Sequence, residues 1–227
     1  MQYELGLHQE LVLLSLNDST GSFGSGTLAY GLAGAIMSEL LLLERIVAGA
    51  DDDKIVEVKS RDKTDDALLD EVLAMINSEN KPLGLNNWIV KTAQIKDMQH
   101  RVAKQLSEAG ILKQDEKKVL WLFTKRIYPE LDSSYEDYIR NRMADQMFEE
   151  SSVLDERTAV LITLAKCVNV LAPNFAAVQL QQHKERIEAI CKGDLLAGSE
   201  TVAMIAAAQT ARTAAMIVAT VAISAAT

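Results

Sequence analysis

The chain has 227 residues and a net charge of −9, and its side chains are 48% hydrophobic but only 5% aromatic. Leu, Ala, Val and Ile therefore supply most of the core, which favours helices over a β-sandwich. The negative charge disfavours general attraction to nucleic acid, so an anionic partner has to be met by a local basic patch. The sequence shows no break between domains, and we expect a single domain over residues 1–227.

Apolar residues at helical spacing dominate the sequence. They predict helices at Leu5–Leu16, Thr27–Val47, Asp65–Ser78, from Asn86 onward, and at Ile95–Ala109. Gly110 follows the last of these as a typical C-terminal glycine. A short alternating strand is expected at Ile55–Lys59, and the chain after Glu130 is predicted to be helical again. We therefore predict a mainly α fold, a compact helical bundle with one protruding β-hairpin.

The predicted hairpin lies in KKVLWLFTKRIYPE, residues Lys117–Glu130. Both faces of a strand over Val119–Phe123 are apolar, and a polar turn follows. The residues concerned are Leu120, Trp121, Leu122 and Phe123 in the strand and Thr124, Lys125 and Arg126 in the turn. Such a hairpin either packs on the helices or enters a membrane interface.

In a membrane, burial of each of three apolar side chains would contribute about 1.5 to 3 kcal/mol. Each cation at the anionic surface would add about 1 kcal/mol. Association itself costs several kcal/mol. The balance predicts weak, reversible docking that needs a second contact.

The usual catalytic and metal-binding patterns are missing from the sequence. The three histidines stand far apart and outside the known motif contexts. The loop Gly21–Thr27 fits part of a P-loop but lacks its lysine, so it is either a connecting loop or an anion site at a helix N-terminus. The acidic runs Ala50–Lys54 and Asp132–Asp137 are either solvated loops and helix caps or sites for a hard cation. We expect no enzyme, no metal site and no cofactor.

The two ends of the chain bear on localisation. Residues 1–16 contain Glu4 and Glu10 and lack the basic region of a signal peptide, and the two cysteines have no metal-type spacing, so we expect a cytoplasmic protein. Residues 201–227 carry one charge, Arg212, and are long enough to span a bilayer. Because Arg212 at the bilayer centre would cost about 2.5 to 3.5 kcal/mol, we favour a helix packed in the core or against another subunit.

Four segments in order resemble the Golgi phosphoprotein 3 family of phosphoinositide-binding peripheral membrane proteins. They are LGLHQELVLLSLND from Leu5, GLAGAIMSELLLLERI from Gly31, HRVAKQLSEAGIL from His100 with the LWLF hairpin after it, and LDERTAVLITLAKCVNVL from Leu154 with SETVAMIAAA after it. The resemblance implies a helical single domain that binds phosphatidylinositol 4-phosphate and inserts the hairpin into the membrane. It also implies an adaptor that holds membrane-protein clients at the cytosolic face of the Golgi.

The family's headgroup pocket uses a tryptophan in the first loop, an arginine in the next helix and two arginines three residues apart before the hairpin. Gly24, Ala33, Lys96 and Gln99 occupy these positions here, so the resemblance leaves Lys96 as the headgroup cation. The family's basic N-terminal tail is missing before the first core helix, which is consistent with a divergent, prokaryotic member.

A second hypothesis is a winged-helix-type DNA-binding regulator, because a helix ending in EAGIL before a two-stranded wing is typical of such modules. The recognition helix would be Ile95–Ala109. Its polar residues would be Lys96, Gln99, His100, Arg101 and Lys104. The net charge of −9 and the apolar wing disfavour this alternative.

Overall fold

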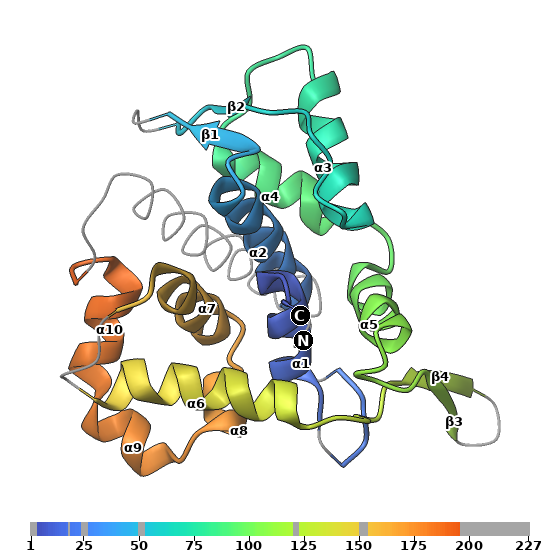
Figure 1. Cartoon of the computed structure of the whole chain (residues 1–227), viewed down its shortest axis with the longest axis vertical. Helices are drawn as coiled ribbons and strands as arrows, with labels where there is room; N and C mark the ends of the chain where they lie inside the picture. Colours follow the sequence, from blue (N-terminus) through green and yellow to red (C-terminus); the bar gives the residue numbers. More distant parts are fainter. Residues whose placement is uncertain are drawn as a thin grey trace, which may run out of the picture.

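The computed structural model describes residues 4–17, 19–23, 27–49, 53–119, 123–149 and 154–195 and is mainly helical (Figure 1). The helices are α1 (Leu7–Ser15), α2 (Leu28–Leu42), α3 (Ala67–Ser78), α4 (Leu85–Ala93), α5 (Met98–Glu108), α6 (Ser134–Phe148), α7 (Glu156–Cys167), α8 (Leu171–Asn174), α9 (Ala177–Gln182) and α10 (Lys184–Lys192). The strands β1 (Ile46–Ala48) and β2 (Val56–Val58) form one antiparallel hairpin, and β3 (Asp115–Val119) and β4 (Phe123–Ile127) form another. The prediction of a mainly α fold with a protruding hairpin is confirmed.

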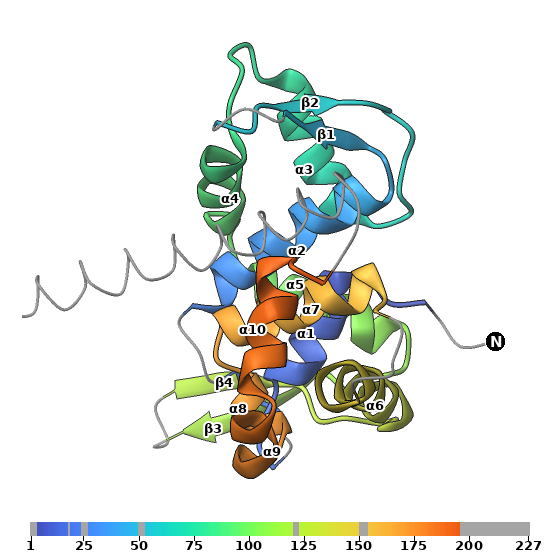
Figure 2. The same cartoon turned by 90° about the vertical axis from the view of Figure 1, so that its left-hand side faces the viewer.

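Helix α2 lies at the centre of the core and is buried at every position from Gly31 to Leu40. A helix that is apolar all round has to be covered on all sides, and α1, α4 and α7 pack against it (Figure 2). The absence of a side chain at Gly31 permits close approach to the residue that follows α7. A Cβ atom at Gly31 would lie only 2.3 Å from Cγ1 of Val168.

Helix α2 ends at Leu42 rather than at the predicted Val47, and Ile46 and Val47, which were predicted to be helical, lie in β1 instead. Glu44 adopts a left-handed conformation with φ of 53°. The backbone N–H of Arg45 donates to the carbonyl of Leu40 at 2.9 Å, which closes a Schellman-type end. The prediction failed because glutamate, rather than glycine, occupies the left-handed position.

Helix α5 also begins later than predicted, at Met98 rather than Ile95. Asp97 has φ of 55°, and a left-handed residue interrupts the helical path before Met98. At the other end Gly110 has φ of 77°, and Ile111 donates its N–H to the carbonyl of Leu106 at 2.9 Å. The predicted C-terminal glycine is confirmed.

The second hairpin has a different register from the one predicted. Val119 at the end of β3 pairs with Phe123 at the start of β4, so these residues do not belong to one strand. Thr124, Lys125 and Arg126 lie on β4 and not in a turn. Among the described residues this ribbon pairs with no third strand, so both of its faces accommodate charged residues. An apolar run in the sequence therefore does not locate its strands.

None of the helices within the described ranges combines the length and the apolar character needed to cross a bilayer. The apolar segment 201–227 lies outside the described residues. Leu120, Trp121 and Leu122 of the expected insertion element and Gly24 of the expected pocket also lie outside them.

Candidate functional site

The β3–β4 hairpin projects from the helical body beside α5 (Figure 1). Its base is fixed by backbone hydrogen bonds on both sides. The N–H of Lys113 donates to the carbonyl of Pro129 at 2.8 Å, and the N–H of Tyr128 donates to the carbonyl of Gly21 at 2.7 Å. The strands are therefore held at their base, while Lys117, Lys118, Thr124 and Lys125 farther along them are exposed to solvent.

Positive charge is concentrated on this hairpin. Between Lys113 and Ile127 the chain carries five basic and two acidic side chains, a net charge of +3 in a protein whose total is −9. Lys117, Lys118, Lys125 and Arg126 are all exposed. Lys117 stands directly opposite Lys125 in the strand register. Like charges in opposed positions destabilise a strand pair, so an anionic partner would stabilise this one.

Strand β4 meets the N-terminal end of α5 through an ion pair. Nη2 of Arg126 lies 3.5 Å from Oδ2 of Asp97, the residue next to the exposed Lys96. The structure therefore places Lys96 near the cations of β4, although nearly thirty positions separate them in the sequence. Ala33 is fully buried within α2, so it does not belong to this exposed group of cations.

Three rings that the sequence analysis did not group form a cluster between α5 and the hairpin. Phe23 contacts His100 edge-on with ring centroids 5.5 Å apart, and it lies 5.9 Å from the ring of Tyr128. Nδ1 of His100 lies 3.1 Å from the hydroxyl oxygen of Tyr128. No local pattern predicts this cluster because the rings come from a loop, a helix and the end of a strand.

The surroundings of the cluster keep both of its titratable groups neutral. Burial, assisted by the positive charge of Arg126, lowers the pKa of His100, while Asp97 opposes the shift. Burial also raises the pKa of Tyr128, and here Arg126 opposes the shift. Neutral imidazole and phenol groups each offer one donor and one acceptor, so they hydrogen-bond without adding charge.

Three of the five side chains that a DNA-recognition helix would need have partners within the fold. Arg101 is hydrogen-bonded to Glu71, and Nζ of Lys104 lies 3.3 Å from Oε1 of Glu108. His100 points into the ring cluster. These contacts disfavour α5 as a groove-reading element. Among the described residues, no three His, Cys, Asp or Glu side chains form a group able to hold a metal ion.

Comparison with known proteins tests the family resemblance that the sequence suggests. The family model described as Golgi phosphoprotein 3 (GPP34) matches residues 7–222. A vacuolar protein sorting-associated protein 74 from Eremothecium gossypii is 29% identical over 201 residues, covering 74% of this chain and 60% of its own. The protein of the same name from Schizosaccharomyces pombe is 30% identical over 163 residues, covering 63% of this chain and 48% of its own. The chain thus matches only about half of the length of these relatives.

Proposed function

The chain belongs to the Golgi phosphoprotein 3 family, and on this premise we propose that it is a non-catalytic protein that docks peripherally on anionic phospholipid membranes. The observation that carries the proposal is the exposed positive charge of the β3–β4 hairpin in a chain of net charge −9. Each of these cations contributes about 1 kcal/mol near an anionic surface. Several together offset much of the cost of association.

The docking site combines two elements. Lys96, Lys125 and Arg126 contact lipid phosphates, and the apolar end of the hairpin enters the interface. The insertion residues are Leu120, Trp121, Leu122 and Phe123. The resemblance to the family implies phosphatidylinositol 4-phosphate as a ligand. With Ala33 and Gln99 in place of arginines, two bidentate phosphate contacts are lost, so binding follows charge density and discriminates little among phosphoinositide isomers.

Membrane docking serves an adaptor role in this proposal. The matched relatives carry names that refer to vacuolar protein sorting. We propose that this chain likewise binds membrane-protein clients from the cytosolic side, on Golgi membranes in a eukaryotic cell. One domain over residues 1–227, able to associate with further copies of itself, provides this function.

Co-sedimentation with vesicles tests the proposal. The vesicles contain phosphatidylcholine alone, phosphatidylcholine with phosphatidylserine, or phosphatidylcholine with one phosphoinositide isomer at matched charge. The variant Lys117→Gln/Lys125→Gln should lose about tenfold or more in affinity for anionic vesicles, because each cation contributes about 1 kcal/mol. The control Lys184→Gln/Lys192→Gln removes the same charge from α10 and should bind like the parent.

Two results would reject the proposal. One is equal loss of binding in both double variants, which would mean that net charge rather than the hairpin governs docking. The other is a failure of the parent protein to bind any anionic vesicle at low salt. A DNA mobility shift at the same salt is the parallel test of the winged-helix alternative, which predicts a shift where membrane docking predicts none.

A further inference from the structure

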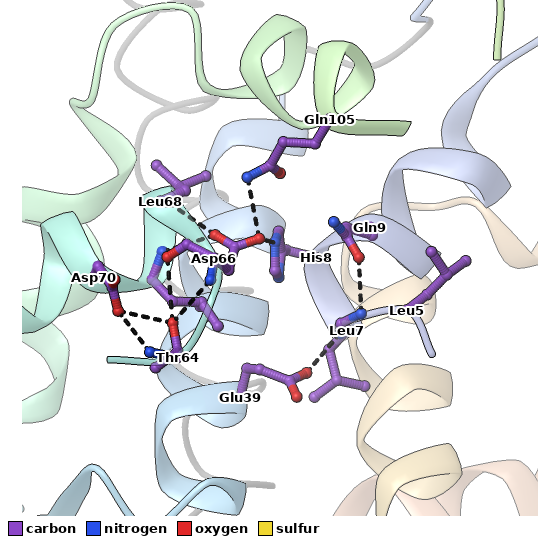
Figure 3. A network of polar contacts seen from close by, with 12 residues as sticks. Leu5, Leu7, His8, Gln9, Glu39, Thr64, Asp66, Leu68, Asp70 and Gln105 are labelled. Carbon is purple, nitrogen blue, oxygen red and sulfur yellow. Dashed lines mark hydrogen bonds and ion pairs between the residues drawn. The ribbon is translucent and has the colours of Figure 1, made fainter. Parts of the chain in front are cut away.

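A cavity of about 340 Å³ opens beside the N-terminal end of α1, and none of its lining residues belongs to the proposed lipid site. Four helices contribute to it or border it: α1 with His8, α2 with Glu39, α7 with Arg157, and the entry of α3 with Asp65 and Asp66. Figure 3 shows polar contacts made by several of the lining residues, among them His8, Glu39 and Asp66. A cavity this polar at a junction of helices is a candidate site for a charged small group.

Asp66, the N-cap residue of α3, holds the ring of His8 in one orientation. This ring is 1% exposed, and Nε2 lies 3.1 Å from Oδ2 of Asp66 (Figure 3). Burial acts to raise the pKa of the Asp66 carboxyl, but hydrogen bonds from His8 and from the backbone N–H groups of Leu69 and Leu68 hold it well below its ordinary value. Asp66 is thus a carboxylate, which only accepts hydrogen bonds. The hydrogen of this contact is therefore on Nε2 of His8.

When the ring is neutral, this assignment leaves Nδ1 of His8 as an acceptor. Nδ1 is buried, and no hydrogen-bond donor meets it among the described residues. Gly6 borders the same space, and a Cβ atom at that position would lie 3.0 Å from Nδ1. Gly6 therefore has no side chain that would cover this nitrogen. A buried acceptor without a partner is unfavourable, and a ligand that donates a hydrogen bond would remove the penalty.

The charge around the cavity identifies the kind of donor. The lining residues include four carboxylates, Glu4, Glu39, Asp65 and Asp66, and one guanidinium, Arg157. Arg157 is already bound, with Nη1 3.0 Å from Oε1 of Glu39 and Nη2 2.6 Å from the carbonyl of Leu5. Glu39 and Arg157 offset each other, which leaves the field of the exposed Glu4 and Asp65. This field favours a cation over an anion or a neutral group.

We propose that this cavity binds a primary ammonium group, which donates a hydrogen bond to Nδ1 of His8 and is attracted by the carboxylates of Asp65 and Glu4. Leu5, Leu43 and Leu69 also line the cavity and cover the alkyl chain that carries the ammonium. A compact ammonium with three donors suits one nitrogen acceptor and two carboxylates. The group comes either from a free polyamine or from a lysine side chain of a polypeptide.

Nitrogen NMR of the imidazole rings tests this proposal directly. The sequence has three histidines, so His100 and His183 serve as internal controls in the same spectrum. The probes are spermidine, Nα-acetyl-lysine amide and Nα-acetyl-norleucine amide, the last a neutral match for the lysine derivative. We expect His8 to show an unprotonated Nδ1 whose resonance shifts saturably with an amine probe, while His100 and His183 do not respond. The norleucine derivative should leave all three unchanged.

The relative affinities of the two amines identify the source. Tighter binding of spermidine points to a free polyamine, and tighter binding of the lysine derivative points to a polypeptide side chain. Three results would overturn the proposal: a protonated Nδ1 on His8 in the free protein, no shift with either amine, or an equal shift with the norleucine derivative. Each is independent of lipid binding, so it leaves the proposed membrane function untouched.

A charge variant with a matched control completes the test. Asp65 has φ of 62°, a conformation that asparagine tolerates, so Asp65→Asn removes one carboxylate without strain. Amine affinity should fall about threefold to fivefold, the contribution of one exposed charge pair. Glu57→Gln makes the same change of charge on the exposed side of β2 and should bind as the parent does. Equal affinities of the Asp65 variant and the parent would contradict the predicted contact.

Discussion

Nδ1 of His100 in α5 lies 3.1 Å from the hydroxyl oxygen of Tyr128, which directly follows β4. Tyr128 is 1% exposed, and its N–H also donates to the carbonyl of Gly21. A helix, a loop and the base of the hairpin are thus joined at one buried residue. Because buried polar groups are costly without partners, this contact helps to fix the direction in which the hairpin projects.

The His100 environment predicts a pH dependence of stability. Its pKa in the folded protein is lowered by burial and by Arg126, so below the ordinary value of about 6.5 the unfolded chain binds more protons than the folded one. Stability from this group is therefore complete above that pH and is lost as the pH falls through the lowered pKa. Thermal melting between pH 7.5 and 5 should show this loss for the parent and less of it for His100→Asn. A control, His183→Asn, should retain the parent's slope.

Replacement of the aromatic side chains of the hairpin separates membrane insertion from core packing. If these side chains insert, Trp121→Ser/Phe123→Ser should leave the melting temperature nearly unchanged and reduce vesicle binding about tenfold or more. If they pack in the core, each loss would cost about 3 to 5 kcal/mol and would unfold a domain of ordinary stability. A melting temperature far below that of the parent contradicts insertion.

Asp66 joins three helices through one carboxylate. Oδ1 caps α3 by accepting from the N–H groups of Leu68 and Leu69, and Oδ2 lies 3.1 Å from both Nε2 of His8 and Nε2 of Gln105. Asp66→Ala should reduce the free energy of unfolding by about 2 to 4 kcal/mol, from the lost cap and the unpaired polar groups that remain. Asp66→Asn keeps the cap oxygen and should cost about half as much.

Acid unfolding gives a second measurement on the same residue. Because the pKa of Asp66 is lowered in the folded state, its contribution is present above the ordinary carboxyl pKa of about 3.9 and is lost as the pH falls below that value. Urea unfolding from pH 5 to pH 3 should therefore show a steeper loss of stability for the parent than for Asp66→Asn. Parallel curves would contradict a special role for this carboxylate.

The close approach of α2 to Val168 predicts a coupled pair of substitutions. Gly31→Ala would bring a Cβ atom to 2.3 Å from Cγ1 of Val168, and a stiff β-branched side chain does not move aside easily. The single variant should lose about 1 to 3 kcal/mol. Val168→Ala opens the space, so the double variant should be more stable than the sum of the two losses by about 1 kcal/mol. Additive losses would show that the two residues do not interact.

Much of the helical framework was predictable from the sequence because it depends on local chemistry. The apolar spacing of Leu7 to Ser15, the aspartate that begins α3 and the glycine that ends α5 act within one or two turns of helix. The ordered likeness to a family also depends on the sequence alone. These features can be predicted without knowing which residues lie next to them in space.

Only the tertiary structure decided where α2 ends, how the hairpin pairs and which residues meet at its base. A left-handed glutamate at position 44 has no reliable local signal, and the pairing of Val119 with Phe123 depends on a ribbon exposed on both faces. Phe23, His100 and Tyr128 come together because three separate elements pack at one point. His8 gains its unpaired nitrogen only through Asp66, 58 positions away. Contacts of this kind are set by how the packed elements approach one another, which no local pattern encodes.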